Sequence, residues 1–196
     1  QKDDVRASEV IRHIRNLVHK RQTEMRVVNL NQLVLETLGF ISIEARRRHI
    51  LCESEIAHGL PMVKGDSTQL QQVLLNLALN AMDAMAKSPR GQRCLKLSTC
   101  ASATGWVEVI VRDTGSGISP DRLPKLFESF FTTKDDGMGL GLSISKAIIE
   151  AHHGRVWGEN NPGGGATFGF ALPPTNISDE DVISTRTAWP SLQQQP

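Results

Sequence analysis

The chain has 196 residues, 39% of which are hydrophobic, so it can form one domain with a real core and flanking segments. Its formal net charge of +1 argues against a protein that coats nucleic acid or another polyanion. The three cysteines are an odd count without C-x-x-C spacing. This argues against a disulfide framework or a structural zinc site and suits a reducing compartment.

No apolar run approaches the roughly 20 residues that cross a bilayer, and no signal peptide opens the chain. We therefore expect a cytoplasmic fragment that makes no membrane contact, which leaves open an anchor elsewhere in a longer parent protein. The consecutive arginines at 46–48 have no interleaved aromatic residues, so we interpret them as a solvated helix face. No nucleic-acid partner is expected.

The N-terminal segment is predicted to form a charge-rich amphipathic helix over residues 3 to about 26. Its apolar stripe, which includes Val10, Ile14 and Leu17, is narrow and surrounded by basic side chains. Because so narrow a stripe cannot form a core alone, we expect a partner helix from the same chain or from a second subunit.

Residues 29–174 alternate irregularly between helical and strand patterns. A second helix is expected within VVNLNQLVLETLGFI, with Asn29 or Asn31 as its N-cap, and HILCESEI is typical of a short strand. The most clearly marked helix is GDSTQLQQVLLNLALNAMDAM, where Asp66 can cap the first turn and Gln69 can complete a capping box.

Paired strands are predicted in two places. CLKLSTCAS and WVEVIVRD should form a hairpin that turns at Thr104 and Gly105, and RVWGEN and ATFGFAL should form a second one. Between the hairpins lie a long loop (114–139) and the helix LGLSISKAIIEAHH, which Gly154 ends. Hairpins interleaved with helices favour a two-layer α/β sandwich with a mixed sheet, rather than a doubly wound parallel sheet.

Two glycine-rich elements are candidates for ligand binding. DTGSGI places Asp113 at a strand end, followed by Gly115 and Gly117, and GMGLGLSI places three further glycines directly before a helix. Backbone N–H groups can approach a ligand closely at glycines, and a helix N-terminus carries partial positive charge, so the second element could cradle phosphates. Neither element fits the P-loop or the dinucleotide-binding motif, and each alone is also common in ordinary turns.

The order of the motifs is more specific than any one of them. NLALNAMDAM, DTGSGI, FESFFTTK, GMGLGLSI and GGGATF follow one another along the chain. In this the chain resembles the ATP-binding catalytic domain of sensor histidine kinases, with its N, first glycine, F and second glycine boxes. The residues of these boxes are most similar to those of oxygen-sensing and nitrogen-regulatory kinases. The resemblance implies the Bergerat fold, which gyrase B, the large heat-shock chaperone and mismatch-repair ATPases share.

The resemblance also implies a division of the chain. Residues 1–28 would be the C-terminal helix of an incomplete hairpin for dimerisation and histidine phosphotransfer. Residues 29–174 would be the catalytic ATP-binding domain, and residues 175–196 a flexible tail or linker.

The family's site residues can be carried over to the matching positions. Asn80 would hold Mg²⁺ together with the ATP phosphates, and Asp113 would accept a hydrogen bond from the adenine amino group. Gly115 and Gly117 would leave room for adenine, and Thr167 matches a threonine that helps to bind adenine through water. The other implied nucleotide contacts are Thr132, Thr133, Lys134, Gly137, Gly139, Leu140, Gly141 and Leu142.

The F box suggests a lid over the nucleotide. Phe127, Phe130 and Phe131 would anchor this lid, with simple packing in the core as the alternative interpretation. Ser129 stands where similar kinases usually have proline, which would loosen the lid.

Asn76 lies one turn before Asn80, where the ATPase branches of the superfamily carry a glutamate that activates water. An amide cannot accept a proton near neutral pH, so the site should present the γ-phosphate to an incoming nucleophile rather than to water. Catalysis would then rest on positioning and charge neutralisation by Asn76, Asn80 and Lys134.

The implied function is transfer of the γ-phosphoryl group of ATP to a histidine on the dimerisation hairpin of a homodimeric kinase. From there the group would pass to an aspartate on the receiver domain of a response regulator. The alternatives are an ATP-gated conformational ATPase of the gyrase or chaperone type, a nucleotide-sensing module, and a serine kinase of the anti-sigma type.

HIRNL at His13 resembles the phosphoacceptor box of the family, but it lacks the acidic residue and the proline of that box. We therefore expect the acceptor upstream of Gln1, and we expect the chain not to label itself. The other histidines have no such context and are interpreted as surface or structural residues: His19, His49, His58, His152 and His153.

Overall fold

The computed structural model describes residues 24–131 and 139–175. The strands are β1 (Arg26–Val28), β2 (Leu51–Ile56), β3 (Val63–Gly65), β4 (Cys94–Ala101), β5 (Val107–Asp113), β6 (Arg155–Asn160) and β7 (Ala166–Leu172). The helices are α2 (Leu30–Arg47), α3 (Ser67–Ala84), α4 (Gly141–Ala151) and the short 3₁₀ helix η1 (Leu123–Lys125).

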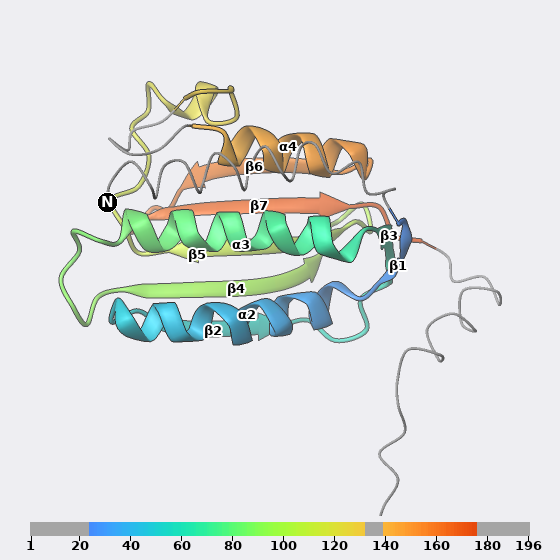
Figure 1. Cartoon of the computed structure of the whole chain (residues 1–196), viewed down its shortest axis with the longest axis horizontal. Helices are drawn as coiled ribbons and strands as arrows, with labels where there is room; N and C mark the ends of the chain where they lie inside the picture. Colours follow the sequence, from blue (N-terminus) through green and yellow to red (C-terminus); the bar gives the residue numbers. More distant parts are fainter. Residues whose placement is uncertain (1–23, 132–138, 176–196) are drawn as a thin grey trace, which may run out of the picture.

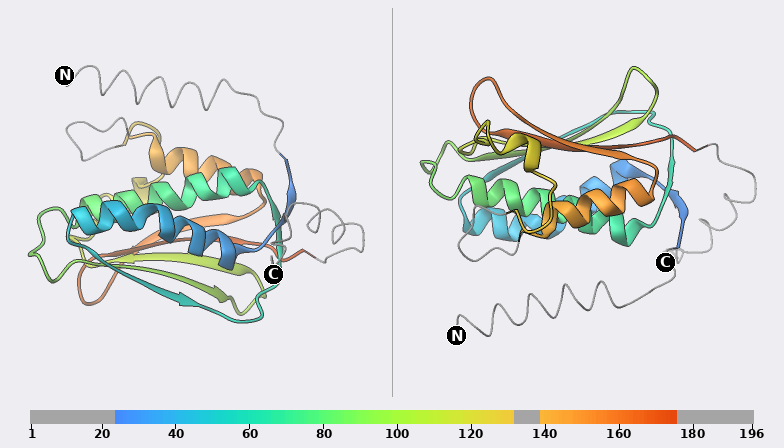
Figure 2. Two further views of the ribbon diagram at one scale, coloured as in Figure 1. Left: turned by 60° about the horizontal axis from the view of Figure 1, so that its bottom comes forward. Right: turned by 90° about the horizontal axis from the view of Figure 1, so that it is seen from above.

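Five strands form one sheet in the order β2-β4-β5-β7-β6 (Figure 1). Strands β2 and β4 are parallel, and the other neighbouring pairs are antiparallel. Helices α2, α3 and α4 lie side by side over one face of this sheet, so the molecule has one layer of helices and one of strands (Figure 2). The predicted two-layer sandwich with a mixed sheet and two hairpins is confirmed.

The core lies between these two layers. In β4 and β5, every second side chain is buried, for example Leu95, Leu97, Val109 and Val111, as expected for a sheet covered on one face. Helix α3 runs along the middle of the layer and buries Leu70, Val73, Leu74, Leu77, Ala78, Ala81 and Met82. The candidate site residues of α3 therefore lie on the narrow part of the helix surface that this packing leaves uncovered.

Helix caps fix where α2 and α3 begin. The side chain of Asn29 accepts hydrogen bonds from the N–H groups of Asn31 and Gln32, and Asp66 does the same for Thr68 and Gln69. The predicted N-cap of α3 is confirmed, and Asn29 is the correct choice for α2.

The backbone N–H of Asp66 donates to Nε2 of His152 at 2.9 Å, while Nδ1 of His152 lies 2.7 Å from the carbonyl oxygen of Ile148. The His152 side chain is only 2% exposed. It therefore ties the C-terminal end of α4 to the beginning of α3, in agreement with the structural role predicted for it.

A two-stranded antiparallel sheet was not predicted from the sequence. Its strands β1 and β3 have three residues each, too short for alternation to be visible. The first helix was expected to reach about residue 26, but Arg26 already begins β1, so this part of the prediction is wrong. Because β1 pairs with β3, residues 26–28 are joined to the larger domain through this small sheet.

Several sequence predictions concern residues outside the described ranges. They are the N-terminal helix up to residue 23, its His13, and the tail from residue 176 onward. At the C-terminal end of the described chain, Pro174 bridges Val63, and the N–H of Thr175 donates to the carbonyl oxygen of Met62.

Candidate functional site

The carboxylate of Asp113 is the most unusual polar group in the described part of the chain. Asp113 ends β5 and is 1% exposed. Its Oδ1 accepts hydrogen bonds from the N–H groups of Gly115 (2.7 Å) and Ala166 (3.2 Å). Its Oδ2 is buried and has no hydrogen-bond partner among the described residues. Buried acceptors are nearly always paired, so Oδ2 is suited to a donor from a ligand.

Burial raises the pKa of Asp113 from its usual value, and the two backbone N–H donors oppose this shift. A buried carboxylate with an unpaired oxygen lowers the stability of the fold. Such a destabilising group is typical of a binding site and not of a residue whose role is to stabilise the fold.

The loop after Asp113 brings the backbone close to the end of α3. A Cβ atom on Gly115 would lie 2.8 Å from the carbonyl carbon and oxygen of Ala84, so only glycine fits there. The N–H of Ser116 donates to that same oxygen at 3.3 Å. The loop therefore joins the carboxylate of β5 to the C-terminal end of α3.

Asn76 and Asn80 lie one turn apart on α3, and both are half-buried. Nδ2 of Asn76 donates to Oγ of Ser145 at 2.9 Å, and Ser145 Oγ donates to the carbonyl oxygen of Gly141 at 3.0 Å. A Cβ atom on Gly141 would lie 2.5 Å from Asn76 Oδ1. Asn76 is thus fastened to the first turn of α4.

The N-terminus of α4 lies beside Asn76. Its N-cap residue, Leu140, makes no side-chain capping hydrogen bond. The first N–H groups of a helix have no partner within the helix, and together with the helix dipole they favour an anion. Gly141 and Leu142, which the resemblance gives as nucleotide contacts, begin this turn.

These features, and the fold that holds them, can be compared with known proteins. Residues 65–176, more than half of the chain, match the family model for histidine kinase-, DNA gyrase B-, and HSP90-like ATPases. The chain belongs to this family. The Bergerat fold that the sequence motifs implied is thereby confirmed.

Within the family, the similar proteins are sensor histidine kinases, as the motifs predicted. The sensor protein FixL of Bradyrhizobium diazoefficiens is 46% identical over 169 residues, which are 86% of this chain and 33% of FixL. A crystal structure of the kinase ShkA in complex with AMPPNP is 28% identical, with a TM-score of 0.73, over 89% of this chain and 36% of that one. The histidine kinase ThkA, in complex with the response regulator TrrA, is 31% identical, with a TM-score of 0.72, over 88% of this chain and 48% of that one. The chain therefore spans only part of each of these proteins.

Thr167 is the site residue implied by the resemblance whose position in the structure differs most from the others. Thr167 pairs with Arg112 in the β5–β7 register, and Phe168 pairs with the buried Val111, so Thr167 lies on the sheet face away from the helices. Its hydroxyl donates to Oδ1 of Asn161 at 2.6 Å. Ala166, one residue earlier, is the β7 residue that contacts the Asp113 carboxylate. The side chain of Thr167, predicted to bind adenine through water, therefore lies on the opposite face of the sheet from the Asp113 carboxylate, because a shift of one residue in a strand reverses the face.

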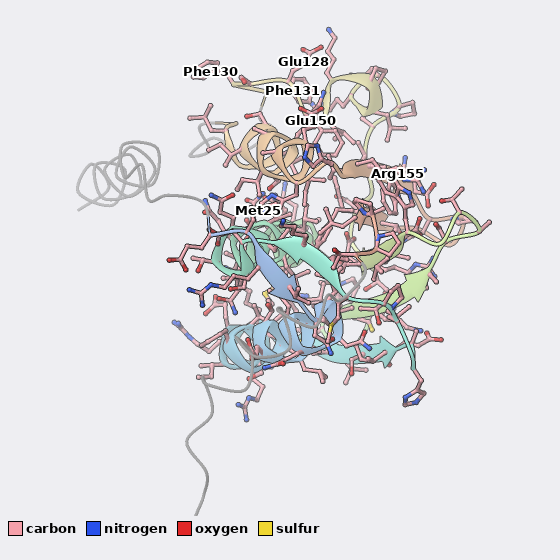
Figure 3. All side chains as sticks on the ribbon, turned by 90° about the vertical axis from the view of Figure 1, so that its right-hand side faces the viewer. Met25, Glu128, Phe130, Phe131, Glu150 and Arg155 are labelled. Atoms are coloured by element: carbon pink, nitrogen blue, oxygen red, sulfur yellow. The ribbon has the colours of Figure 1, made fainter. Side chains whose placement is uncertain are left out.

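The phenylalanines of the F box have different surroundings. Phe127 packs partly against the core, whereas Phe130 is 76% exposed. Figure 3 shows Glu128, Phe130 and Phe131 together at one edge of the molecule. The N–H of Phe130 donates to the carbonyl oxygen of Gly139 at 3.0 Å, so the backbone before and after residues 132–138 is held together. Thr132, Thr133, Lys134 and Gly137 lie outside the described ranges.

Sequence reasoning left Asp83 unassigned. Its Oδ1 lies 2.6 Å from Nη1 of Arg48, whose Nε lies 2.6 Å from Glu44 Oε1. This network joins α2 to α3, and the Arg48 guanidinium holds the pKa of Glu44 below its usual value.

The described residues contain no group of three or more His, Cys, Asp or Glu side chains that could hold a metal ion. They also contain no helix that is long and apolar enough to cross a membrane.

Proposed function

We propose that this chain is the ATP-binding catalytic part of a sensor histidine kinase. It would bind Mg·ATP, and its parent protein would transfer the γ-phosphoryl group to a histidine on a dimerisation hairpin. The observation that carries the proposal is the buried, unpaired Oδ2 of Asp113 in a chain whose relatives are sensor histidine kinases.

Adenine fits the site for a chemical reason. Its exocyclic amino group is a donor and could pair with Oδ2 of Asp113, while Gly115 leaves the approach free of side chains. Guanine presents an acceptor oxygen at the equivalent position, which would leave the buried carboxylate unpaired and repelled.

The phosphates would lie at the N-terminus of α4, where Gly139, Leu140, Gly141 and Leu142 supply backbone groups. By the family resemblance, Thr132, Thr133, Lys134 and Gly137 would add contacts. The protein ligand of Mg²⁺ would be Asn80, whose amide oxygen is a hard donor. One protein ligand would suffice at such a site, because Mg²⁺ takes its other ligands from phosphates and water. When bound, Mg²⁺ would neutralise phosphate charge.

In the transfer itself, the imidazole nitrogen of the acceptor histidine would form a bond to the γ-phosphorus, and the bond to the leaving oxygen of ADP would break. Position 76 offers no carboxylate to activate water, and its amide is engaged by Ser145. We therefore assign Asn76 a positioning role, and this disfavours the ATPase alternative.

The proposed function also implies which partners the protein has. The acceptor histidine would come from the protein's own dimerisation hairpin or from a second subunit of a homodimer. ThkA is solved with a response regulator, which supports a receiver domain as the next phosphoryl acceptor.

The test is a titration of the 196-residue chain with Mg·ATP and Mg·GTP, followed by incubation with ATP labelled on the γ-phosphate. We expect binding of ATP, weaker binding of GTP, and neither steady hydrolysis nor self-labelling. Asn80→Ala should weaken binding in the presence of Mg²⁺ much more than in its absence. Steady ATP turnover would favour the ATPase alternative, and an acid-labile phosphate on His13 would contradict an acceptor elsewhere.

A further inference from the structure

Two consecutive asparagines at the end of β6 contact the loop that follows Asp113. Asn160 is the last residue of β6, and Asn161 begins the turn toward β7. We propose that Asn160 and Asn161 are positioning residues that fix the adenine-binding loop, defined as residues 114–118. The inference rests on the proposed ATP-binding function and adds to it two residues that do not themselves touch the ligand.

Asn160 holds the far end of the adenine-binding loop by a two-point contact. Its Oδ1 accepts from the N–H of Ile118 at 2.7 Å, and its Nδ2 donates to the carbonyl oxygen of Ile118 at 2.7 Å. Because both backbone polar groups of one residue are engaged, the contact fixes the direction of the loop as well as its distance from β6. Gly117, with φ +72°, lies directly against this amide: a Cβ atom there would be 3.0 Å from Asn160 Oδ1.

Asn161 holds the near end of the loop. Its Nδ2 donates to the carbonyl oxygen of Asp113 at 3.0 Å, and its Oδ1 accepts from the hydroxyl of Thr167 at 2.6 Å. Its own N–H donates to the carbonyl oxygen of Gly165 at 3.0 Å. The Thr167 hydroxyl thus sets the orientation of the Asn161 amide, which gives this buried threonine a function behind the site rather than in it.

The two contacts matter because the loop orients the carboxylate. The N–H of Gly115, inside the loop, donates to Oδ1 of Asp113, and this bond determines which oxygen is left for a ligand. A short loop with two glycines has many conformations when it is free, and fixing it before binding lowers the entropy cost of binding. The asparagines should therefore act on affinity for the adenine end of the nucleotide.

The stability of the unbound protein should depend on Asn160 much less than the affinity for ATP does. Its side chain is exposed, so truncation leaves no cavity, and water can satisfy the backbone groups of Ile118 in the unbound protein. This separates a positioning role from a general structural one.

The test compares Asn160→Ala and Asn160→Asp with the parent chain in titrations with ATP and with inorganic triphosphate. Asn160→Ala should raise the Kd for ATP about tenfold, as expected for the loss of two hydrogen bonds. The Kd for triphosphate and the Tm of the unbound protein should stay close to those of the parent. Asn160→Asp keeps the size and the acceptor but faces the Ile118 carbonyl with a carboxylate oxygen, so it should bind ATP no better than Asn160→Ala.

Glu159→Ala is the matched control, because Glu159 is exposed on the same strand and its side chain lies on the other face. It should bind ATP as the parent does. Equal losses of ATP and triphosphate binding in Asn160→Ala, or no loss of ATP binding, would overturn the inference. Failure of the parent chain to bind ATP would instead overturn the proposed function.

Discussion

The amide of Asn76 and the hydroxyl of Ser145 are joined by a 2.9 Å hydrogen bond between α3 and α4. This bond links the helix that carries Asn80 to the helix whose first turn is the candidate phosphate site. The glutamate of the ATPase branches would have to act on water from the same position. In this chain the position is used to hold two helices in register.

Removing this link should loosen the phosphate site without dismantling the core. We expect Ser145→Ala and Asn76→Ala each to weaken ATP binding several-fold, since each removes one hydrogen bond of about 1 kcal/mol. Measured as a double-mutant cycle, the two effects should overlap strongly, because the second substitution removes a bond that is already lost. Additive effects on ATP affinity would show that Asn76 and Ser145 act separately.

Asp113→Asn should separate binding from stability. The variant places an amide donor where the adenine amino group would need an acceptor, so ATP affinity should fall about a hundredfold, as when a buried polar group is mismatched with its ligand. In the unbound protein a buried charge is replaced by a neutral group. We therefore expect denaturant unfolding at neutral pH to show the variant at least as stable as the parent.

The difference in stability between Asp113→Asn and the parent chain should also depend on pH. Burial raises the folded-state pKa of Asp113 above its unfolded value, so the ionised form opposes folding at neutral pH and this penalty is relieved by protonation. The stability difference between variant and parent should shrink as the pH falls from 7 into the acid range in which Asp113 is protonated, because its pKa is raised by burial. A difference that is constant with pH would contradict an energetic cost of the Asp113 charge.

His152→Ala should be strongly destabilising. The side chain is 2% exposed and pairs with backbone groups at the end of α4 and the beginning of α3. Its loss leaves a cavity and an unpaired N–H at Asp66, which together should cost about 2–4 kcal/mol of unfolding free energy in urea. His58→Ala, at an exposed turn, is a control that should change stability very little.

His153→Gly should stabilise the protein. His153 follows the end of α4 with φ 58°, a conformation that costs a residue with a Cβ about 1 kcal/mol relative to glycine. Gly154→Ala should do the opposite, because a Cβ atom there would lie 2.5 Å from the carbonyl oxygen of Ala171. Thermal unfolding of both variants checks the pair, and a lower Tm for His153→Gly would contradict the strain at this position.

The sequence predicted those elements whose signals are local. The caps at Asn29 and Asp66, the hairpin that turns at Gly105 and the helix that stops before Gly154 all depend on a few adjacent residues, and all are confirmed. Strands β1 and β3 are separated by the 34 residues between Val28 and Val63, and neither is long enough to show a period of its own. Their pairing depends on tertiary packing, which no local pattern reports.

The residues of the candidate site also divide into those with a local sequence signal and those without one. Ordered motifs singled out Asp113, Gly115 and Gly141. In the structure Asp113 carries a buried oxygen without a partner among the described residues, and a Cβ atom on either glycine would clash with its neighbours. Thr167 was matched to a threonine that binds adenine through water, but Ala166 is the β7 residue that contacts the Asp113 carboxylate, since motif matching does not fix strand register to a single residue. Asn160 and Asn161 were overlooked because an amide that braces a distant loop has no characteristic spacing.

The chain enters and leaves the described domain at one corner. Strand β1 pairs with β3, and Pro174 and Thr175 contact Val63 and Met62 beside it (Figure 1). Helix α3 starts directly after β3 and, with 18 residues, reaches about 27 Å toward the nucleotide end. A rotation of the domain about this corner would therefore move the far end of α3 the most. By the same helix geometry, a rotation of about 10° would displace the C-terminal end of α3, which contacts the adenine-binding loop at Gly115 and Ser116, by about 5 Å without changing any contact inside the domain.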